Sequence, residues 1–566
     1  MPHEFVTGLP STHGDSYQLN TTTLIRHAVR TYPEQEIVFR TAEGGWDRYT
    51  YADAYGRVMR GANALRALGA GAGDVVGVLD WNSKRHFELY WAIPGIGATM
   101  LQMNLRLAAE DLAYVTEHSA ASVVLVDESL LAVAEALAPR VPGVETWVVM
   151  TDRPLGELQT TLPGAVHWED LLRAAEPTID WPVIAETTAY SACYTTGTTG
   201  RPKGIYYSHR GIYLHTLAET AALGMHADDA VMLITPMFHA QSWGLPQSAI
   251  YSAAKIILPG RYVAEDTSVL VETMIRERVS VANGAPAIFQ PMMDYIKTLP
   301  EAPDLSRARL LSGSTEPPLS LMRDFFEITG ADVIHAYGAT ETAPLVAINR
   351  GLKPSLRGAL NEDERWNLKR KQGLLVNGVD VRVVDAEGND LPHDGTSQGE
   401  VLLRGPWIIE SYDKMGADEA ADKFLDGYWR SGDVGTVDQH GYLKITDRMK
   451  DVVRSGGEWI SSIDMENALV GHARIREAAV IGVAHPKWQE RPLAIVATFD
   501  GAELSVDEVN SALTGKFAKW QLPDTVLFVD ALPRTSVGKL DKKLLRELHA
   551  DIYAGAQATA AVTTGR

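Results

Sequence analysis

Between about residues 50 and 350 the chain alternates helical periodicity with short apolar runs, and this alternation limits its possible folds most strongly. Apolar side chains recur at helical spacing from Tyr55 to Leu68, and the apolar run Asp74–Leu79 follows directly. Further runs that predict buried strands are Ala121–Val126, Thr146–Met150, 279–282, 310–311 and 333–334. Strands that alternate with helices indicate an α/β fold with largely parallel sheets.

The pattern changes at Asp380. Short segments joined by Gly/Asp turns, such as Gly399–Arg404 and Gly441–Ile445, predict antiparallel strands. After Asp447 comes a smaller α+β pattern, with a helix around 463–469 and strands at 478–483 and 493–498. We therefore expect a large N-terminal domain of stacked α/β sheets (1–446), whose residues 380–446 form a small β-barrel-like subdomain, and a small α+β C-terminal domain (447–566). Several lobes are expected in 566 residues, because single cores stop growing near about 250–300 residues.

The composition excludes several classes of protein. A hydrophobic content of 45% is enough for a sizeable core. A net charge of −20 disfavours a general nucleic-acid or anionic-membrane binder, so any phosphate site must be a local basic pocket. The N-terminus has no signal-peptide pattern, and no apolar run reaches the ~18 residues of a membrane span. The sequence thus predicts a cytoplasmic protein with no nucleic-acid partner and no integral membrane segment.

Cys193 is the single cysteine, which excludes an internal disulfide and a cysteine-based zinc site. It also fits a reducing compartment. Its place just before a polar loop would allow a nucleophile, but the pattern favours a buried, unreactive thiol.

The segment Tyr194–Gly204 combines hydroxyl, glycine and basic residues behind one tyrosine. Glycines let the backbone approach phosphate oxygens, hydroxyls and amides donate to them, and a lysine adds charge, so the segment suits a polyphosphate. It is not a Walker A motif, because Pro202 stands where that motif needs glycine before its lysine. On composition alone, an ordinary flexible linker is the alternative.

Four further segments accompany this loop: Tyr337–Glu341, Tyr428–Asp433, Asp447–Gly457 and Pro533–Lys539. Together, and in this order, the five resemble the adenylate-forming superfamily of acyl-CoA synthetases, luciferases and peptide-synthetase adenylation domains. The resemblance covers residues from about 20 to 550. The segments that look closest to bacterial medium- and long-chain fatty acyl-CoA ligases are Pro236–Trp243, Ser455–Ser461 and His485–Pro492.

The resemblance implies that a carboxylic acid is joined to the α-phosphate of ATP with release of pyrophosphate, and that the acyl group then passes to CoA. The residues it implies for ATP are Thr195, Thr196, Gly197, Thr198, Thr199, Gly200, Lys203, Gly313, Ser314, Tyr337, Gly338, Asp433 and Arg448. Those implied for catalysis are Lys539, Thr340, Glu341 and His239. Glu341 would hold Mg²⁺, a hard cation that suits one carboxylate plus phosphate oxygens. Lys539 would stabilise charge on the α-phosphate and acid carboxylate.

The resemblance also implies an acid side and an acceptor side. Residues implied for the acyl pocket are His239, Trp243, Gly244, Ser312, Thr315 and Glu316, with Gly244 and Ala249 leaving room for a chain. Those implied for the acceptor side are Lys450, Ser455, Gly456, Gly457 and Trp459, where Lys450 is the hinge of a mobile C-terminal domain. Ser314, Glu316 and Ala339 depart from the family pattern, which hints at a shorter, cyclic or more polar acid.

Other interpretations of these residues stay open. Taken singly, Glu341 could be a helix-start acid, Asp433 a turn aspartate, His239 a core histidine and Lys539 a surface lysine. An amide-forming ligase, in which an amine or amino acid captures the acyl-adenylate, shares the same motifs, and a luciferase-like oxygenase shares the fold. A non-catalytic nucleotide-binding regulator would be expected to lack Lys539 or Glu341, and both are present. Family analogy alone predicts a homodimer through the N-terminal lobe.

Overall fold

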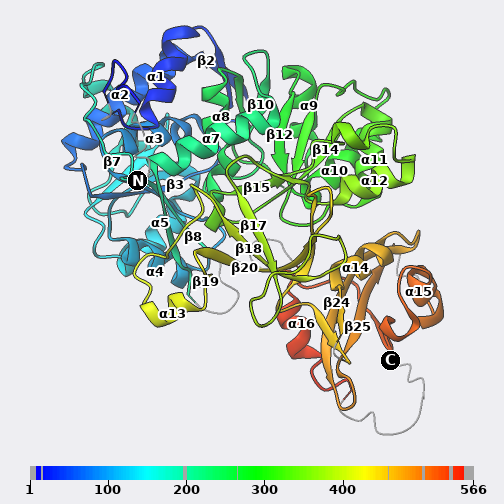
Figure 1. The fold of residues 1–566 in the computed structure, drawn as a ribbon. Helices are drawn as coiled ribbons and strands as arrows, with labels where there is room; N and C mark the ends of the chain where they lie inside the picture. The colour runs from blue at the N-terminus through cyan, green and yellow to red at the C-terminus, as the bar shows by residue number, and fades with distance from the viewer. Residues whose placement is uncertain are drawn as a thin grey trace, which may run out of the picture.

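The structure, a computed structural model, describes residues 8–14, 17–195, 201–263, 266–456, 458–499, 504–534 and 540–553. Figure 1 shows a large upper lobe coloured blue to green and a smaller lower lobe coloured orange to red, with the yellow strands of a small sheet between them. The chain is therefore divided into a large and a small lobe, as the pattern predicts. No helix among these described residues is long and apolar enough to cross a membrane.

Two sheets form the large lobe. The first has the order β7 (Val166–His167), β6 (Thr146–Met150), β5 (Ala121–Asp127), β3 (Val75–Leu79), β4 (Thr99–Gln102), β8 (Ala189–Tyr194), β9 (Gly204–Ser208). The second has the order β16 (Leu374–Leu375), β15 (Leu345–Ile348), β14 (Asp332–Gly338), β13 (Arg309–Ser312), β12 (Val281–Gly284), β10 (Ala230–Met232), β11 (Lys255–Leu258), β1 (Glu36–Arg40), β2 (Trp46–Thr50). Most neighbours are parallel, and antiparallel pairs occur at the sheet ends, as in β8–β9 and β14–β15. This confirms the α/β prediction.

Helices cover both sheets of the large lobe. They are α1 (Thr22–Thr31), α2 (Tyr51–Ala67), α3 (Lys84–Gly95), α4 (Ala109–Ser119), α5 (Leu131–Leu137), α6 (Trp168–Ala174), α7 (His209–Leu223), α8 (Leu245–Tyr251), α9 (Ser268–Glu277), α10 (Pro286–Ile296), α11 (Leu319–Asp324) and α12 (Glu362–Arg370). The main apolar core draws on both sheets, with large side chains such as Trp91, Tyr190 and Phe87 fully buried.

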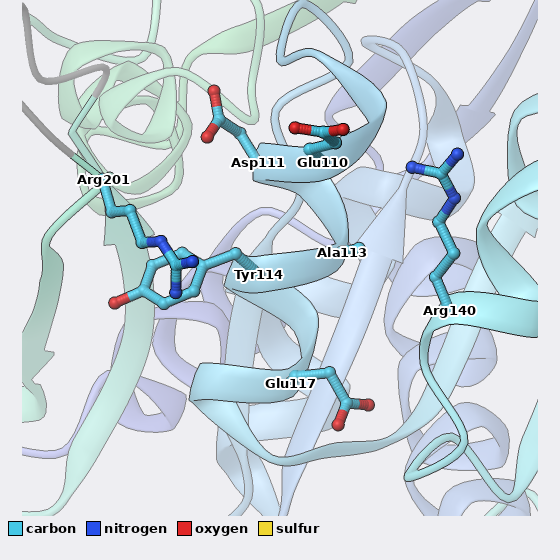
Figure 2. A pocket seen from close by; sticks show the side chains of 7 residues that line it. All are labelled: Glu110, Asp111, Ala113, Tyr114, Glu117, Arg140 and Arg201. Atoms are coloured by element: carbon cyan, nitrogen blue, oxygen red, sulfur yellow. The ribbon is translucent and has the colours of Figure 1, made fainter.

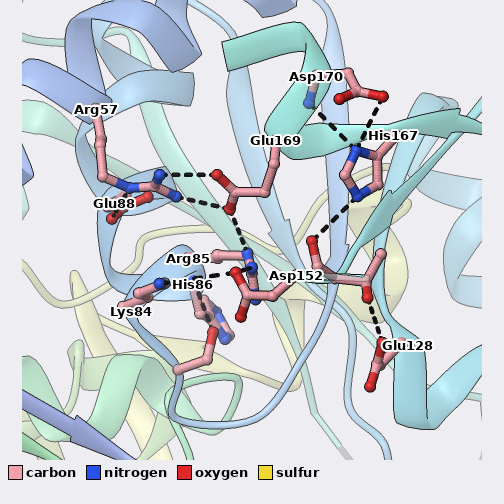
Figure 3. Close-up of polar contacts among 12 residues, drawn as sticks. Arg57, Lys84, Arg85, His86, Glu88, Glu128, Asp152, His167, Glu169 and Asp170 are labelled. Atoms are coloured by element: carbon pink, nitrogen blue, oxygen red, sulfur yellow. Dashed lines mark hydrogen bonds and ion pairs between the residues drawn. The ribbon is translucent and has the colours of Figure 1, made fainter. Parts of the chain in front are cut away.

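A partly buried ion network ties α2, α3 and α6 together (Figure 3). Arg57 contacts Glu88 at 2.7 Å and Glu169 at 2.8 Å, while Arg85 contacts Glu169 at 2.7 Å. Burial raises the pKa of Glu169, but hydrogen bonds from Arg57 and Arg85 outweigh it and lower that pKa to about 2. Arg57 and Arg85 both pair with Glu169, so removing any one of these three side chains leaves an uncompensated charge among the other two. The network therefore fixes helix positions rather than forming a reaction site.

The antiparallel segment forms one small sheet of β17 (Asp380–Val384), β18 (Gly399–Arg404), β19 (Phe424–Leu425), β20 (Tyr428–Val437) and β21 (Leu443–Arg448). The short helix α13 (Ala417–Ala421) precedes β19. Strand β21 runs on to Arg448, past the predicted domain boundary at 446.

The C-terminal lobe is α+β, as predicted. Its sheet contains β22 (Val453–Ser455), β23 (Glu458–Ile460), β24 (Ile475–His485), β25 (Gln489–Thr498) and β26 (Thr525–Phe528), and its helices are α14 (Ser462–Val470), α15 (Val506–Leu513) and α16 (Lys542–Leu548).

Polar contacts join this lobe to β21. The Lys444 ammonium lies 2.8 Å from the Asp464 carboxylate, and the backbone N–H of Ser462 donates to Asp447 at 2.5 Å. The Ser461 hydroxyl also donates to the backbone carbonyl of Thr446. These contacts hold the two lobes in the orientation seen here.

Candidate active site

The residues predicted to bind the nucleoside meet where the ends of β14 and β21 lie beside the middle of β20. The Tyr337 hydroxyl donates to Asp433 Oδ2 at 2.5 Å, and Arg448 Nε lies 2.9 Å from Asp433 Oδ1. The register of β20 against β21 places Asp433 directly opposite Arg448. Burial raises the pKa of Tyr337, and the Asp433 charge raises the pKa of Arg448. The buried carboxylate of Asp433 thus lies between the Tyr337 phenol and the Arg448 guanidinium.

A close turn after β14 brings Thr340 and Glu341 to the same place. A Cβ on Gly338 would lie 1.8 Å from the carbonyl oxygen of Pro344, so only glycine fits there. The backbone carbonyl of Thr340 accepts a hydrogen bond of 2.6 Å from Tyr207 of β9, which links the two large sheets. The close approach of Gly338 to Pro344 and the hydrogen bond from Tyr207 therefore fix the turn that follows Tyr337.

Glu341 is partly buried and bonded to a residue that no sequence pattern singled out. The Tyr412 hydroxyl donates to Glu341 Oε1 at 2.9 Å and accepts from Trp429 Nε1 at 3.1 Å. Burial raises the pKa of Glu341, and the Tyr412 hydrogen bond acts in the opposite direction. A tyrosine in a polar turn segment gives little signal in the sequence, which is why Tyr412 was missed.

The two ends of the predicted phosphate loop pair with each other, and Lys203 lies over the ring of Tyr412. Thr195 and Lys203 pair through a backbone hydrogen bond of 3.0 Å. The Lys203 ammonium lies 3.2 Å from Glu419 and 5.3 Å from the centre of the Tyr412 ring. Thr196, Gly197, Thr198, Thr199 and Gly200 lie outside the described residues.

Arg201, at the far end of this loop, lies over the ring of Tyr114 on α4, with 4.9 Å between the guanidinium carbon and the ring centre (Figure 2). Both residues line a surface hollow of about 310 Å³ together with Glu110, Asp111 and Glu117. Arg140 lines it as well, so three carboxylates face two arginines, and Arg201 has acidic groups near it there. Two loop cations, Arg201 and Lys203, are therefore in contact with groups of the protein itself.

On the acid side, the segment after His239 adopts a left-handed turn. Residues Ala240, Gln241, Ser242 and Trp243 all have φ between 44° and 63°. Such backbone costs about 1–2 kcal/mol per non-glycine residue, so surrounding contacts must hold it. Asn283, at the end of β12, provides one, because its amide donates to the backbone oxygen of Ser242 at 2.8 Å.

This turn directs the Trp243 indole against the end of β13. A Cβ on Gly313 would lie 2.8 Å from Trp243 Cη2, so the indole covers the Gly313 backbone. Ser312 is buried, whereas Ser314 and Thr315 are exposed. The Glu316 carboxylate faces α12, where Arg370 Nε donates to it at 2.8 Å. The Glu316 carboxylate thus contacts α12, while Thr315 is exposed.

The residues predicted for the acceptor side lie in the C-terminal lobe and in the segment that joins it to β21. Ser455 is buried and lies 3.3 Å from Arg491. Gly456 has φ +63°, and a Cβ there would lie 3.2 Å from the Trp488 ring. Trp459 is half-buried on β23, and burial lowers the pKa of Lys450. Gly457 and Lys539 lie outside the described residues.

Cys193 lies buried on β8, and burial raises the pKa of its thiol to about 12. A thiol so far from ionisation is a poor nucleophile. This confirms the prediction of a buried, unreactive cysteine.

Comparison with known proteins finds matches over most of the chain. Residues 25–413 match the family model of the AMP-binding enzymes, and residues 464–539 match that of the AMP-binding enzyme C-terminal domain. A long-chain-fatty-acid–CoA ligase of Thermus thermophilus is 41% identical over 98% of this chain and 100% of its own length. A 3-methylmercaptopropionyl-CoA ligase of Ruegeria lacuscaerulensis is 38% identical over 94% of this chain and 97% of its own. Among solved structures, an anthranilate CoA ligase in complex with anthranoyl-AMP superposes with a TM-score of 0.81 at 25% identity, covering 94% of this chain and 98% of its own.

Proposed function

The chain belongs to the AMP-binding enzyme family, and on this premise we propose that it converts a carboxylic acid into its CoA thioester through an acyl-adenylate. It is an AMP-forming acid–thiol ligase of the adenylate-forming superfamily. The observation that supports the proposal best is the contact of Tyr337, Asp433 and Arg448 beside Glu341. It offers a ribose acceptor and a carboxylate for the phosphate end within one small region.

In the first step the acid's carboxylate oxygen attacks the α-phosphorus of ATP, an O–P bond forms, and pyrophosphate leaves. The protein mainly positions the reactants and neutralises charge. Asp433 accepts hydrogen bonds from the ribose hydroxyls, for which an ionised carboxylate has two oxygens. Thr340 and Lys539 stabilise charge at the α-phosphate, and Lys203 contacts the leaving phosphates.

The residues present fit Mg²⁺ as a cofactor bound together with ATP. Within the described ranges no three His, Cys, Asp or Glu side chains gather as a metal site, but Mg²⁺ commonly uses one or two carboxylates plus phosphate oxygens. Glu341, held by Tyr412, would supply that carboxylate. When bound, the ion neutralises charge on the phosphates.

In the second step the CoA sulfur attacks the acyl carbonyl carbon, an S–C bond forms, and AMP leaves. Ser455, Gly456 and Gly457 line the approach of the thiol, and Lys450 is the hinge about which the C-terminal lobe turns. For this turn the Lys444–Asp464 ion pair across the lobes has to break.

Medium- or long-chain fatty acids and similar acids are the proposed substrates. The relatives named above act, by their names, on long-chain fatty acids and on 3-methylmercaptopropionate, so the class ranges from long apolar chains to a short acid. No comparably specific observation favours an amine as acceptor.

The test is a panel of carboxylic acids scored by pyrophosphate release, repeated with CoA and with amino acids as acceptors. We expect acid-dependent release that CoA accelerates, and Lys539→Ala should lower acid-dependent ATP–pyrophosphate exchange by about 100-fold or more. Acid-dependent release that only amino acids accelerate would contradict the CoA step. Unchanged exchange in Lys539→Ala would contradict the role of that lysine.

A further inference from the structure

Arg491 is a buried arginine of the C-terminal lobe. It lies on β25 and is only 6% exposed, and a charged group so deep in the protein needs partners. The Asp524 carboxylate accepts two parallel hydrogen bonds from it, one from Nε at 2.6 Å and one from Nη2 at 2.8 Å. A forked contact of this kind fixes the plane of the guanidinium as well as its position.

The other three N–H groups of Arg491 reach the backbone before β26 and the end of β22. Nη1 donates to the backbone carbonyl of Trp520 at 2.5 Å, and Nη2 donates to that of Leu522 at 2.9 Å. Nη1 also donates to the Ser455 hydroxyl at 3.3 Å. A guanidinium has five N–H donors in a rigid fork, and here all five have an acceptor. The side chain therefore joins the end of β22 to the 520–524 segment.

The turn that follows β22 rests on the hairpin of β24 and β25. Ser455 pairs with the first residue of β25, and the backbone N–H of Gly456 donates to the carbonyl of Trp488 at 2.9 Å. These contacts hold the turn to the tip of that hairpin, whereas Arg491 also connects it to the 520–524 segment. In the proposed mechanism, Ser455 and Gly456 line the approach of the CoA thiol.

We infer that Arg491 is a positioning residue for the transfer of the acyl group to CoA, because it holds the Ser455–Gly456 turn against the 520–524 segment. The inference rests on the proposed function. Lysine could not take this place, since an ammonium offers three donors at one point, whereas the five contacts of Arg491 diverge over two segments. A displacement of about 1 Å at a positioning group can lower a rate by about 100-fold, so loss of the fork should slow the thiol step.

The test measures the two steps separately, because the C-terminal lobe carries residues proposed for both, Lys539 for the first and Ser455 for the second. Acid-dependent ATP–pyrophosphate exchange with octanoate reports the first step. Thioester formation from preformed octanoyl-adenylate and CoA reports the second. Where another acid of the panel above gives faster exchange, that acid and its adenylate replace octanoate.

For Arg491→Met we expect kcat/KM for CoA in thioester formation to fall by about 10–100-fold, while exchange stays within about threefold of the wild type. Arg491→Lys, which keeps the charge but not the fork, should lie between the two. A double variant tests the route through Ser455. If Arg491 acts through this hydroxyl, the two losses overlap, so Ser455→Ala combined with Arg491→Met should lie within about twofold of Arg491→Met alone.

Arg476→Met is the matched control in the same sheet. Arg476 lies on β24, and its Nη2 donates to the backbone carbonyl of Asp530 at 2.5 Å, but its side chain is 41% exposed. Both steps should therefore stay within about twofold of the wild type. If Arg491→Met does not fold, Asp524→Asn weakens the same fork from its half-exposed end and should lower kcat/KM for CoA by about three- to tenfold.

Three results would overturn the inference while leaving the proposed function intact. Equal losses of exchange and of thioester formation would mean that Arg491 acts through the stability of the whole lobe. A wild-type kcat/KM for CoA in Arg491→Met would mean that the turn keeps its place without the guanidinium. Losses that multiply fully in the double variant would exclude the route through Ser455. If the wild type forms no thioester from any acyl-adenylate, the proposed function itself fails.

Discussion

The two ends of the proposed nucleotide site differ in how completely the protein assembles them. At the nucleoside end, strand register places Asp433 opposite Arg448, and Tyr337 of a neighbouring sheet donates to the same carboxylate. At the polyphosphate end, Lys203 contacts Glu419 and Arg201 lies over Tyr114. The nucleoside end is preorganised. At the other end, Lys203 and Arg201 have to exchange protein partners for phosphates, and that exchange lowers the net affinity for ATP.

The largest expected effect comes from breaking the preorganised end. Asp433→Ala removes the acceptor of Tyr337 and leaves Arg448 without its partner, so kcat/KM for ATP should fall by about 100–1,000-fold. Initial rates of pyrophosphate release at varied ATP measure this.

The same sheet offers a matched control. Tyr428, Asp380 and Arg404 form a second Tyr–Asp–Arg contact, with distances of 2.6 Å and 3.0 Å, in which the aspartate and the arginine are exposed and the tyrosine is buried. Asp380→Ala should leave kcat/KM for ATP within about twofold. Equal losses in the two variants would mean that Asp433 acts through the stability of the sheet.

A smaller effect is expected where the two ends join, at Tyr412. Tyr412→Phe removes the hydrogen bond to Glu341 but keeps the ring near Lys203, and should lower kcat by about tenfold. That hydrogen bond favours the ionised carboxylate, so its loss raises the pKa of Glu341 further above its ordinary value. Because the ionised form is the active one, the acid limb of the pH–kcat profile should move to higher pH.

Tyr428→Phe, which removes a tyrosine hydroxyl that donates to Asp380 and not to Glu341, is the control for this profile. An acid limb at the same pH in Tyr412→Phe as in the wild type would show that Glu341 does not govern it.

The smallest effect, and one of opposite sign, is expected at the polyphosphate end. Glu419→Gln removes the partner of Lys203, and since Glu419 is exposed the gain is modest: KM for ATP should fall by about two- to threefold at low salt. The difference should vanish at high ionic strength, because salt screens exposed charges.

Asp418→Asn on the same helix removes an equal charge without this contact. If it lowers KM as much as Glu419→Gln does, general charge and not the Lys203 contact is responsible, and the contrast between the two ends weakens.

Much of the fold could be predicted from periodicity, because strands such as β3, β5 and β6 are continuous apolar runs. The motif residues could be predicted as well, but their contacts could not. Asp433 meets Tyr337 only because sheets distant in sequence come together, and local pattern carries no information on that.

The positions of the polar residues inside the core could not be predicted from the sequence for a different reason. Helical periodicity assigns polar residues to the solvent face, so it gives no ground for placing Glu219 of α7, which is 1% exposed, inside. Tyr412 stands in a polar turn and looks like a surface residue, although Glu341 binds it. Glu316 departs from the family pattern in the sequence, but its hydrogen bond with Arg370 depends on where α12 packs.

Burial of Cys193 makes the chain convenient for spectroscopy. Because its thiol is covered and hard to ionise, thiol reagents added under native conditions should report free CoA and not the protein. The same property leaves the surface free for engineered labels. A pair of cysteines introduced on β21 and α14 could carry fluorophores without removal of the native residue, so rotation of the C-terminal lobe could be followed during turnover.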